Sequence, residues 1–237
     1  PIKESYLKGV DILILRELTG GIYFGKRGRT STNAFDTCEY TISEIERILR
    51  RAGNLAKKRR GKVTSIDKHN VLDTSRLWRD TADKIFSEEF SEIELEHIYI
   101  DAATMHLLSK PNTFDVMVTD NMFGDIISDE ASMLSGSLGL LPSASLGHNN
   151  FGLYEPVHGS APDIAGKGIA NPTGAILSLA MMFRHSFNLN FIADAIEDAV
   201  HQTFSKNYFT ADLSQEKTHH NVSTSDFGNE VLLNLSI

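Results

Sequence analysis

Short apolar runs alternate with stretches of helical periodicity along most of this chain. The apolar and β-branched runs predict strands at residues 10–15, 62–67, 95–100 and 114–119. Apolar residues spaced three and four apart predict a helix through residues 44–49 that ends before Gly61, a helix over residues 75–90, and two helices between residues 171 and 205. Helical stretches also follow the last two strands. This alternation is typical of an α/β fold with much parallel strand pairing.

The segment between residues 20 and 40 follows neither pattern. It is rich in Gly, Thr and aromatic residues, and we expect an extended hairpin or arm there. Residues 20–27 resemble a phosphate-binding P-loop, but Arg27 stands where a Ser or Thr hydroxyl is needed and no helix is expected to follow. Residues 166–171 lack the preceding strand of a Rossmann turn. Neither glycine-containing segment predicts a nucleotide site by itself.

The composition is ordinary for a globular protein. Of the 237 residues, 41% are hydrophobic and 23% are charged. No apolar stretch reaches the roughly 18–20 residues that span a bilayer, and we expect neither a signal peptide nor a membrane partner. The single cysteine, Cys38, cannot form an internal disulfide, so we expect a reducing compartment and a cytoplasmic location. The chain starts at Pro1 rather than Met, and we expect it to be a fragment.

Charge is spread unevenly. Residues 1–70 hold 15 of the 23 Lys and Arg residues but only 8 of the 31 Asp and Glu residues. The basic run at residues 57–60 has two interpretations. It is a nucleic-acid patch, or it ends a solvated helix where cations favour the helix dipole. No aromatic residues are interleaved with these charges, so we expect no nucleic-acid partner.

Two carboxylates after the strand at residues 114–119 are the strongest candidates for chemistry. Asp125 and Asp129 are four residues apart and would share one helix face. They would lie near the carboxyl end of a parallel strand, where open α/β sheets bind ligands. Paired carboxylates suit Mg²⁺ or Mn²⁺, but they are also common in the solvated first turn of a helix. Spacing alone leaves both interpretations open.

Two further residues end predicted strands. Asp101 follows the strand at residues 95–100, where it is either a metal ligand or an ordinary helix N-cap. Lys68 follows the strand at residues 62–67, where it is either a general base or an ordinary surface lysine. The sequence pattern does not decide between these alternatives.

Several motifs in order resemble the β-decarboxylating isocitrate/isopropylmalate dehydrogenase family, and within it the isopropylmalate branch. They are residues 16–25 (RELTGGIYFG), 67–72 (DKHNVL), 75–79 (SRLWR), 121–131 (NMFGDIISDEA), 136–144 (GSLGLLPSA) and 155–166 (EPVHGSAPDIAG). The resemblance implies oxidative decarboxylation of 3-isopropylmalate to 4-methyl-2-oxopentanoate with reduction of NAD, a step of leucine biosynthesis. It also implies the family's two-domain α/β fold without a Rossmann turn.

The resemblance implies a role for individual residues. Arg16 would bind a substrate carboxylate, Lys68 would remove the hydroxyl proton, and Tyr23 would protonate the enolate left by CO₂. Asp101, Asp125 and Asp129 would hold Mg²⁺ or Mn²⁺, with Asp101 also facing the substrate. NAD would be bound by Asn70, Glu155, His158, Gly159, Ser160, Ala161, Pro162, Asp163, Ile164, Ala165, Gly166, Lys167, Gly168, Ile169, Ala170 and Asn171.

The same resemblance implies a domain organisation. Residues 1–135 would form domain two with the dimer arm, the metal ligands and the catalytic residues, and residues 136–237 the returning half of domain one with the NAD loop. Lys68 and Asp101 would reach into the neighbouring subunit's site, so we expect a homodimer with shared active sites. The other half of domain one would be missing, and with it two further substrate arginines and the apolar pocket.

Two features depart from the family pattern. His69 stands where a small residue is expected, and residues 212–215 lack the expected glycine pair. The alternatives to an isopropylmalate enzyme are a related enzyme acting on isocitrate, homoisocitrate or tartrate, and a non-catalytic homologue. The presence of Asp101, Asp125, Asp129, Lys68 and Tyr23 argues against a non-catalytic homologue.

Overall fold

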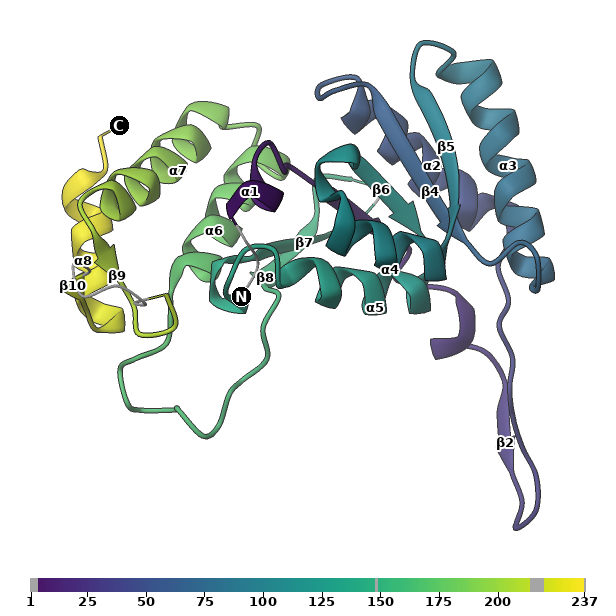
Figure 1. Cartoon of the computed structure of the whole chain (residues 1–237), viewed down its shortest axis with the longest axis horizontal. Coiled ribbons are helices and arrows are strands. Elements are labelled where there is room, and N and C mark those ends of the chain that lie inside the picture. The colour runs from purple at the N-terminus through teal and green to yellow at the C-terminus, as the bar shows by residue number, and fades with distance from the viewer. Residues whose placement is uncertain (1–3, 148, 214–219, 237) are drawn as a thin grey trace. The chain divides into compact units, whose positions relative to one another are not determined.

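The computed structural model describes residues 4–147, 149–213 and 220–236 of the chain. The chain forms two compact units, residues 1–134 and residues 135–237 (Figure 1). Residues 214–219, which include most of the departure from the family pattern near the C-terminus, lie outside the described residues. No helix in the described ranges has the length and apolar character needed to cross a bilayer.

The first unit is built on a four-stranded parallel sheet. Its strands are β1 (Leu13–Arg16), β4 (Lys62–Asp67), β5 (Glu94–Tyr99) and β6 (Val116–Thr119), in the spatial order β1-β6-β4-β5. The three pairings in this sheet are all parallel. The α/β fold expected from the apolar runs is therefore confirmed, and all four strands end at one edge of the sheet.

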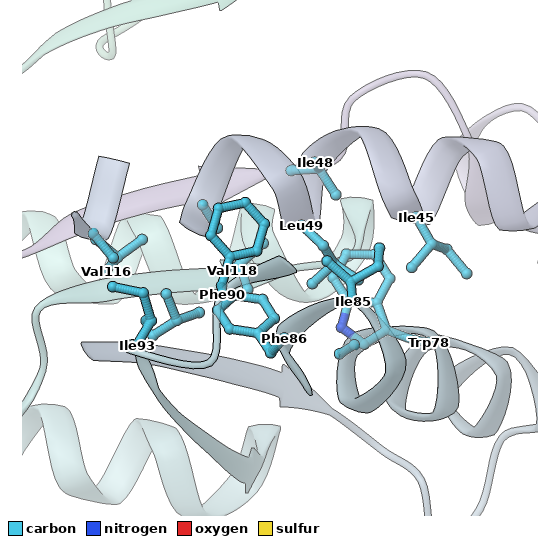
Figure 2. Close-up of a cluster of buried hydrophobic side chains, with 14 of the residues drawn as sticks. Ile45, Ile48, Leu49, Trp78, Ile85, Phe86, Phe90, Ile93, Val116 and Val118 are labelled. Atoms are coloured by element: carbon cyan, nitrogen blue, oxygen red, sulfur yellow. The ribbon is translucent and has the colours of Figure 1, made fainter. Parts of the chain in front are cut away.

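Helices cover both faces of this sheet. α2 (Ile42–Ala56) and α3 (Asp73–Glu89) pack on one face, where Trp78, Leu49 and Phe86 meet alternate residues of the strands (Figure 2). α4 (Ile100–Ser109) and α5 (Asn121–Ser132) pack on the other, around Leu107 and Ile127. Central strands that are apolar on both sides are what a parallel sheet covered on two faces requires.

Short elements complete the first unit. They are α1 (Glu4–Leu7), the 3₁₀ turns at Gly21–Tyr23 (η1) and Pro111–Thr113 (η2), and the antiparallel strands β2 (Arg27–Arg29) and β3 (Ala34–Asp36). β2 and β3 form a hairpin that protrudes from the unit, as Figure 1 shows, and the hairpin expected between residues 20 and 40 is confirmed. Phe35 on this hairpin is exposed.

The basic residues after α2 bind oxygen atoms in the loops that lead into the sheet. Arg59 Nε donates to Asp115 Oδ1 at 2.7 Å, and the backbone N–H of Arg60 donates to Asp115 Oδ2 at 2.9 Å. The Arg60 guanidinium donates to the carbonyl oxygens of Asp11 and Phe114. Asp115 is buried, so these contacts compensate a carboxylate that has lost its hydration. Arg59 and Arg60 thus hold the loops before β1 and β6.

Among the residues of the second unit that the structure describes there are three helices and two pairs of strands. The helices are α6 (Thr173–His185), α7 (Asn190–Ser205) and α8 (Thr224–Asn234). The antiparallel strands are β7 (Pro142–Leu146) and β8 (Gly152–Pro156), and the parallel strands are β9 (Tyr208–Phe209) and β10 (His220–Asn221). A 3₁₀ turn spans Leu138–Leu140 (η3). Its core centres on Phe227, Ala199 and Val200, with Ala180 and Ala193 in a neighbouring cluster.

Candidate active site

The carboxyl edge of the parallel sheet gathers most of the candidate residues. Arg16 ends β1, Lys68 follows β4, Asp101 lies in the first turn of α4 after β5, and α5 begins directly after β6. Because parallel strands end at a common edge, residues far apart in the sequence approach one another there. The structure sorts these residues into two groups.

The first group joins Arg16, Tyr23 and Asp125. Arg16 Nη1 donates to Asp125 Oδ1 at 2.6 Å, and Tyr23 Oη donates to Asp125 Oδ2 at 2.7 Å. Arg16 Cζ also lies 5.6 Å from the centre of the Tyr23 ring. A guanidinium and a hydroxyl therefore share one carboxylate, and Asp125 is 45% exposed by its side chain. The Tyr23 hydroxyl is open to a ligand that displaces it from Asp125.

The turn that carries Tyr23 depends on glycine. Gly21 has φ +77°, and a Cβ at this position would lie 2.0 Å from Tyr40 Oη. Its backbone N–H donates to the Glu39 carbonyl oxygen at 3.0 Å. Only a residue without a side chain allows this left-handed conformation against the Tyr40 ring. The Gly20-Gly21 pair is therefore a packing requirement of the turn.

A buried carboxylate holds the start of the same turn. Glu17, directly after Arg16, is 3% exposed and accepts hydrogen bonds from the backbone N–H groups of Thr19 and Gly20 at 3.0 and 2.8 Å. Arg47 Nη2 on α2 pairs with Glu17 Oε1 at 2.6 Å. This charge-assisted set fixes the chain between β1 and Tyr23. Neither Glu17 nor Arg47 was predicted from the sequence to have this role, although Glu17 immediately follows a candidate residue.

The state of the Tyr23 hydroxyl follows from its partner. The hydrogen bond to the Asp125 carboxylate raises the pKa of Tyr23 above the ordinary tyrosine value. The neutral, protonated form is the one that can donate to a carboxylate. Tyr23 thus holds its proton in this arrangement, which is the state that a general acid needs before it reacts.

The second group joins Lys68 and Asp101. Lys68 Nζ pairs with Asp101 Oδ1 at 2.5 Å and lies 5.9 Å from the centre of the Tyr99 ring. The hydrogen bond from Lys68 lowers the pKa of Asp101, so this carboxylate stays ionised. Lys68 is 27% exposed by its side chain and Asp101 63%. Because both side chains are partly exposed to water, the ion pair can separate and bind a ligand at a modest cost in free energy.

The residue before Lys68 belongs to an ion pair whose carboxylate is buried. Asp67 is 2% exposed and accepts two hydrogen bonds of 2.9 Å from Arg79 on α3, through Nε and Nη2. Asp67 also accepts from the backbone N–H of His69 at 3.0 Å. A bidentate pair holds both planes in register, so it sets the direction of the chain as it leaves β4. His69 is half-buried in the turn that follows, and Asn70 is exposed there.

The three carboxylates expected to bind a metal do not meet within one chain. Asp125 and Asp129 lie one turn apart on α5, and Asp129 is exposed. Asp101 is engaged with Lys68 instead. Across the part of the chain that the structure describes, no three His, Cys, Asp or Glu side chains lie close enough to hold a metal ion. The Asp125–Asp129 pair offers hard oxygen donors, and a third ligand must come from another source.

The expected NAD-binding residues lie in the second unit, apart from Asn70. Glu155 lies in β8. The segment from His158 to Ala170 is a loop without regular secondary structure, and almost all of its residues are exposed. Asp163 is exposed in this loop. Positive φ angles occur at Ala161 (41°), Gly166 (75°) and Gly168 (66°), so the loop changes direction several times.

The end of this loop is anchored at Asn171. The residue is buried, and its Oδ1 accepts from the backbone N–H of Thr173 at 3.0 Å at the start of α6. Asn171 Nδ2 donates to Asp212 Oδ2 at 3.1 Å. Burial raises the pKa of Asp212, but hydrogen bonds from Ser137, Thr210 and Asn171 outweigh it and leave that pKa lowered. An ionised Asp212 therefore ties three segments of this unit together.

The parallel sheet thus gathers an arginine, a tyrosine, a lysine and aspartates at its carboxyl edge, the place where open α/β sheets bind ligands. Sequence comparison defines the class more closely. The chain belongs to the isocitrate/isopropylmalate dehydrogenase family, whose sequence profile matches residues 1–231. The family resemblance of the motifs is thereby confirmed.

Individual relatives agree with this assignment. A 3-isopropylmalate dehydrogenase from Clostridium acetobutylicum is 51% identical over 240 residues, which cover 99% of this chain and 67% of that protein. One from Haemophilus influenzae is 57% identical over 226 residues, which cover 93% of this chain and 62% of that protein. The chain thus spans about two thirds or less of the length of these relatives.

A solved structure gives the same fold. The crystal structure of isocitrate dehydrogenase from Methylococcus capsulatus superposes with a TM-score of 0.87 at 36% identity, and the match covers 94% of this chain and 66% of that one. The isocitrate/isopropylmalate dehydrogenase fold expected from the motifs is confirmed by this similarity.

Proposed function

We propose that this chain acts as a 3-isopropylmalate dehydrogenase, which oxidises and decarboxylates 3-isopropylmalate with NAD in leucine biosynthesis. The observation that carries the proposal is the group formed by Arg16, Tyr23 and Asp125 at the carboxyl edge of the sheet. It combines a cation for a carboxylate, a protonated hydroxyl and a carboxylate in one place. These are the functions that oxidation followed by loss of CO₂ requires.

Arg16 and Tyr23 would have separate roles toward the substrate. The Arg16 guanidinium would bind a substrate carboxylate through its planar edge, which favours bidentate pairing. Tyr23 would deliver its Oη proton to the carbon that has lost CO₂. Before a ligand takes Asp125, the hydrogen bond to that carboxylate raises the pKa of Tyr23, so Tyr23 enters the reaction protonated. Asp125 would thus prepare the acid as well as bind a ligand.

Lys68 would accept the hydroxyl proton as hydride leaves for the nicotinamide. In this chain the Lys68 ammonium is neutralised by Asp101 and lies near the Tyr99 ring. The Asp67–Arg79 pair would keep the Lys68 backbone in position. Lys68 would act as a base only after its ammonium proton has left to solvent, since an ammonium group has no lone pair that could take the proton of a substrate hydroxyl.

Asp125 and Asp129 fit a divalent cation such as Mg²⁺ or Mn²⁺, since both offer carboxylate oxygens from one face of α5. Asp101 of a second copy would complete the set. A cation there would act as a Lewis acid that stabilises negative charge on substrate oxygens. Arg16 and Tyr23 would then turn from Asp125 to the substrate.

A homodimer follows from the same reasoning. The set of three carboxylates needs a second chain, because no three such side chains lie together among the described residues of one chain. α4 and α5 expose Met105, Leu108, Ile126 and Met133, which are apolar side chains that a partner helix can cover. A second copy seated on this face would bring its own Lys68 and Asp101 with it. We propose shared active sites on this basis.

The loop from His158 to Asn171 would bind the adenosine half of NAD, with Glu155 beside it and Asn70 near the nicotinamide. Its exposed main chain and its small residues suit close approach of a nucleotide. The units 1–134 and 135–237 would then correspond to the domain with the catalytic residues and to the cofactor-binding part of the other domain. A cytoplasmic location follows from the proposed pathway.

The test is an assay of the purified protein with the N-terminal segment restored, because residues 1–237 match only about two thirds of the length of the relatives and are expected to be inactive alone. With 3-isopropylmalate, NAD and Mn²⁺, absorbance at 340 nm should rise, and excess EDTA should stop the rise. Isocitrate, homoisocitrate and tartrate should give kcat/KM values at least about 100-fold lower, because specificity pockets discriminate by several kcal/mol. A preference for one of these acids would assign the chain to that substrate instead, and turnover of none of the four would reject the proposed function.

A further inference from the structure

We infer that Asn121 is a positioning residue that holds Arg16 and the turn before Tyr23 in a single arrangement. Asn121 is the first residue of α5, one helical turn before Asp125, and is 2% exposed. Its Oδ1 accepts from Arg16 Nε at 3.0 Å and its Nδ2 donates to the Gly20 carbonyl oxygen at 3.0 Å. This inference rests on the proposed roles of Arg16 and Tyr23.

The contact with Arg16 fixes a side chain that would otherwise be mobile. Arg16 is held at two points along α5, by Asn121 through Nε and by Asp125 through Nη1. Between these points it passes over Gly124, where a Cβ would lie 2.6 Å from Arg16 Cγ. The guanidinium plane is therefore set by the helix surface. When Asp125 turns to another ligand, Asn121 keeps Arg16 in place.

The chemistry of an amide suits this role. Asn121 accepts a hydrogen bond from Arg16 without neutralising its charge, so the guanidinium stays available to a substrate carboxylate. An aspartate of the same shape would compete with that carboxylate. The other end of the amide is equally engaged, since Nδ2 supplies the hydrogen-bond donor that the Gly20 carbonyl oxygen needs.

The backbone of Asn121 is also held by a hydrogen bond. The backbone N–H of Asn121 donates to Tyr40 Oη at 3.0 Å, and the Tyr40 ring packs against Gly20 and Gly21. The start of α5, the Gly20-Gly21 turn and Arg16 thus form one hydrogen-bonded unit. A disturbance at Asn121 would move both the substrate cation and the general acid.

The first experiment separates positioning from stability. Asn121→Ala should raise KM for 3-isopropylmalate about tenfold or more and lower kcat, with KM for NAD unchanged, because a charge-assisted hydrogen bond is lost. Asn121→Asp should also raise that KM, while retaining the Arg16 contact. Asn234→Ala is the matched control, since Asn234 is a buried asparagine whose Nδ2 donates to Thr203 Oγ1 at 2.9 Å in the other unit. It should lower the melting temperature and leave KM unchanged.

A double-mutant cycle shows whether Asn121 acts through Arg16. In an Arg16→Ala background, Asn121→Ala should change KM less than about twofold, because the two residues are directly bonded. The inference would be overturned if Asn121→Ala raised KM about tenfold in the Arg16→Ala background as well. It would also be overturned if Asn121→Ala and Asn121→Asp alone left KM unchanged.

A measurement without turnover keeps this test independent of the proposed function. The ¹⁵Nε signal of Arg16, assigned with Arg16→Lys, should show a protected N–H in the unsubstituted protein and in Asn121→Asp. The protection should disappear in Asn121→Ala. An Arg16 signal unaffected by Asn121→Ala would contradict the positioning role. A protein that does not turn over 3-isopropylmalate would instead reject the proposed function.

Discussion

Tyr23 donates a hydrogen bond of 2.7 Å to Asp125, a residue 102 positions further along the chain. Asp125 accepts from Arg16 through its other oxygen at 2.6 Å. The carboxylate is thus shared between a proposed acid and a proposed substrate-binding cation. A ligand that takes Asp125 therefore frees the Tyr23 hydroxyl and Arg16 Nη1 together.

Replacing Asp125 by Asn should nearly abolish turnover, because an amide is a poor ligand for a hard cation. Folding should change little, since Asp125 is 45% exposed by its side chain. Mn²⁺ titration calorimetry should show affinity reduced at least about tenfold, and urea unfolding a change below about 1 kcal/mol. Asp80→Asn, an exposed carboxylate on α3, is the control and should bind Mn²⁺ normally. Full activity of Asp125→Asn would remove Asp125 from the metal site.

Shared active sites predict complementation between two inactive variants. Asp101→Ala and Asp125→Ala chains should each be inactive alone. Co-expressed, they should recover about a quarter of the activity, because about half of the dimers are mixed and each mixed dimer has one intact site. Asp125→Ala with Asp129→Ala is the control, since both changes lie on the same helix and leave every site defective. No recovery in the first mixture would place Asp101 outside the partner's site.

The fold was predictable where burial dominates. β4 occupies the expected residues 62–67, a run that is buried along almost its whole length and that places Val63 and Ile66 in the two apolar clusters of the unit. β6 begins at Val116 rather than at residue 114, because the Asp115 carboxylate is committed to Arg59 and Arg60. The hairpin of β7 and β8 was not predicted, since its Ser, Ala, Gly and Pro residues carry no alternating pattern.

The candidate site was predictable only in part. The helix spacing that places Asp125 and Asp129 on one face is local, so a sequence pattern contains it. The contact between Asn121 and Arg16 spans 105 positions and depends on how the sheet closes, so no local pattern contains it. Asp67 and Arg79 are closer in sequence, but neither is distinguishable from a surface charge before the burial of Asp67 is known.

The cofactor preference depends on one exposed carboxylate. Asp163 should accept hydrogen bonds from the adenosine ribose of NAD and repel the 2′-phosphate of NADP. We therefore expect kcat/KM for NAD to exceed kcat/KM for NADP. Asp163→Ala should lower kcat/KM for NAD about tenfold and so reduce the ratio of the two values. Asp198→Ala, an exposed carboxylate on α7 of the same unit, should leave both values unchanged. Equal use of the two cofactors by the unsubstituted protein would contradict this assignment.

Asp120 makes the stability of the first unit depend on pH. Its carboxylate caps α5 by accepting from the backbone N–H of Phe123 at 2.8 Å, yet the residue is only 8% exposed. Burial raises the pKa of Asp120 to about 6, against the lowering effect of hydrogen bonds from Phe123 and Met122. The folded state therefore holds this proton more tightly than the unfolded state, whose aspartates titrate near about 3.9. Stability from the protonated form is complete below about pH 4 and is lost as pH rises through about 6.

Asp120→Asn should remove this pH dependence, because asparagine keeps an oxygen acceptor for the cap and has no charge to bury. Relative to the unsubstituted protein, the variant should gain about 1.5 kcal/mol at pH 5 and up to about 3 kcal/mol at pH 8, since each pKa unit is worth about 1.4 kcal/mol. Urea unfolding followed by the fluorescence of Trp78 measures this directly, because the chain has one tryptophan and it lies in the core of this unit. Asp80→Asn should show no such trend. A difference between Asp120→Asn and the unsubstituted protein that is equal at pH 5 and pH 8 would mean that Asp120 is already ionised throughout this range, with its charge compensated by the helix start and by Arg16.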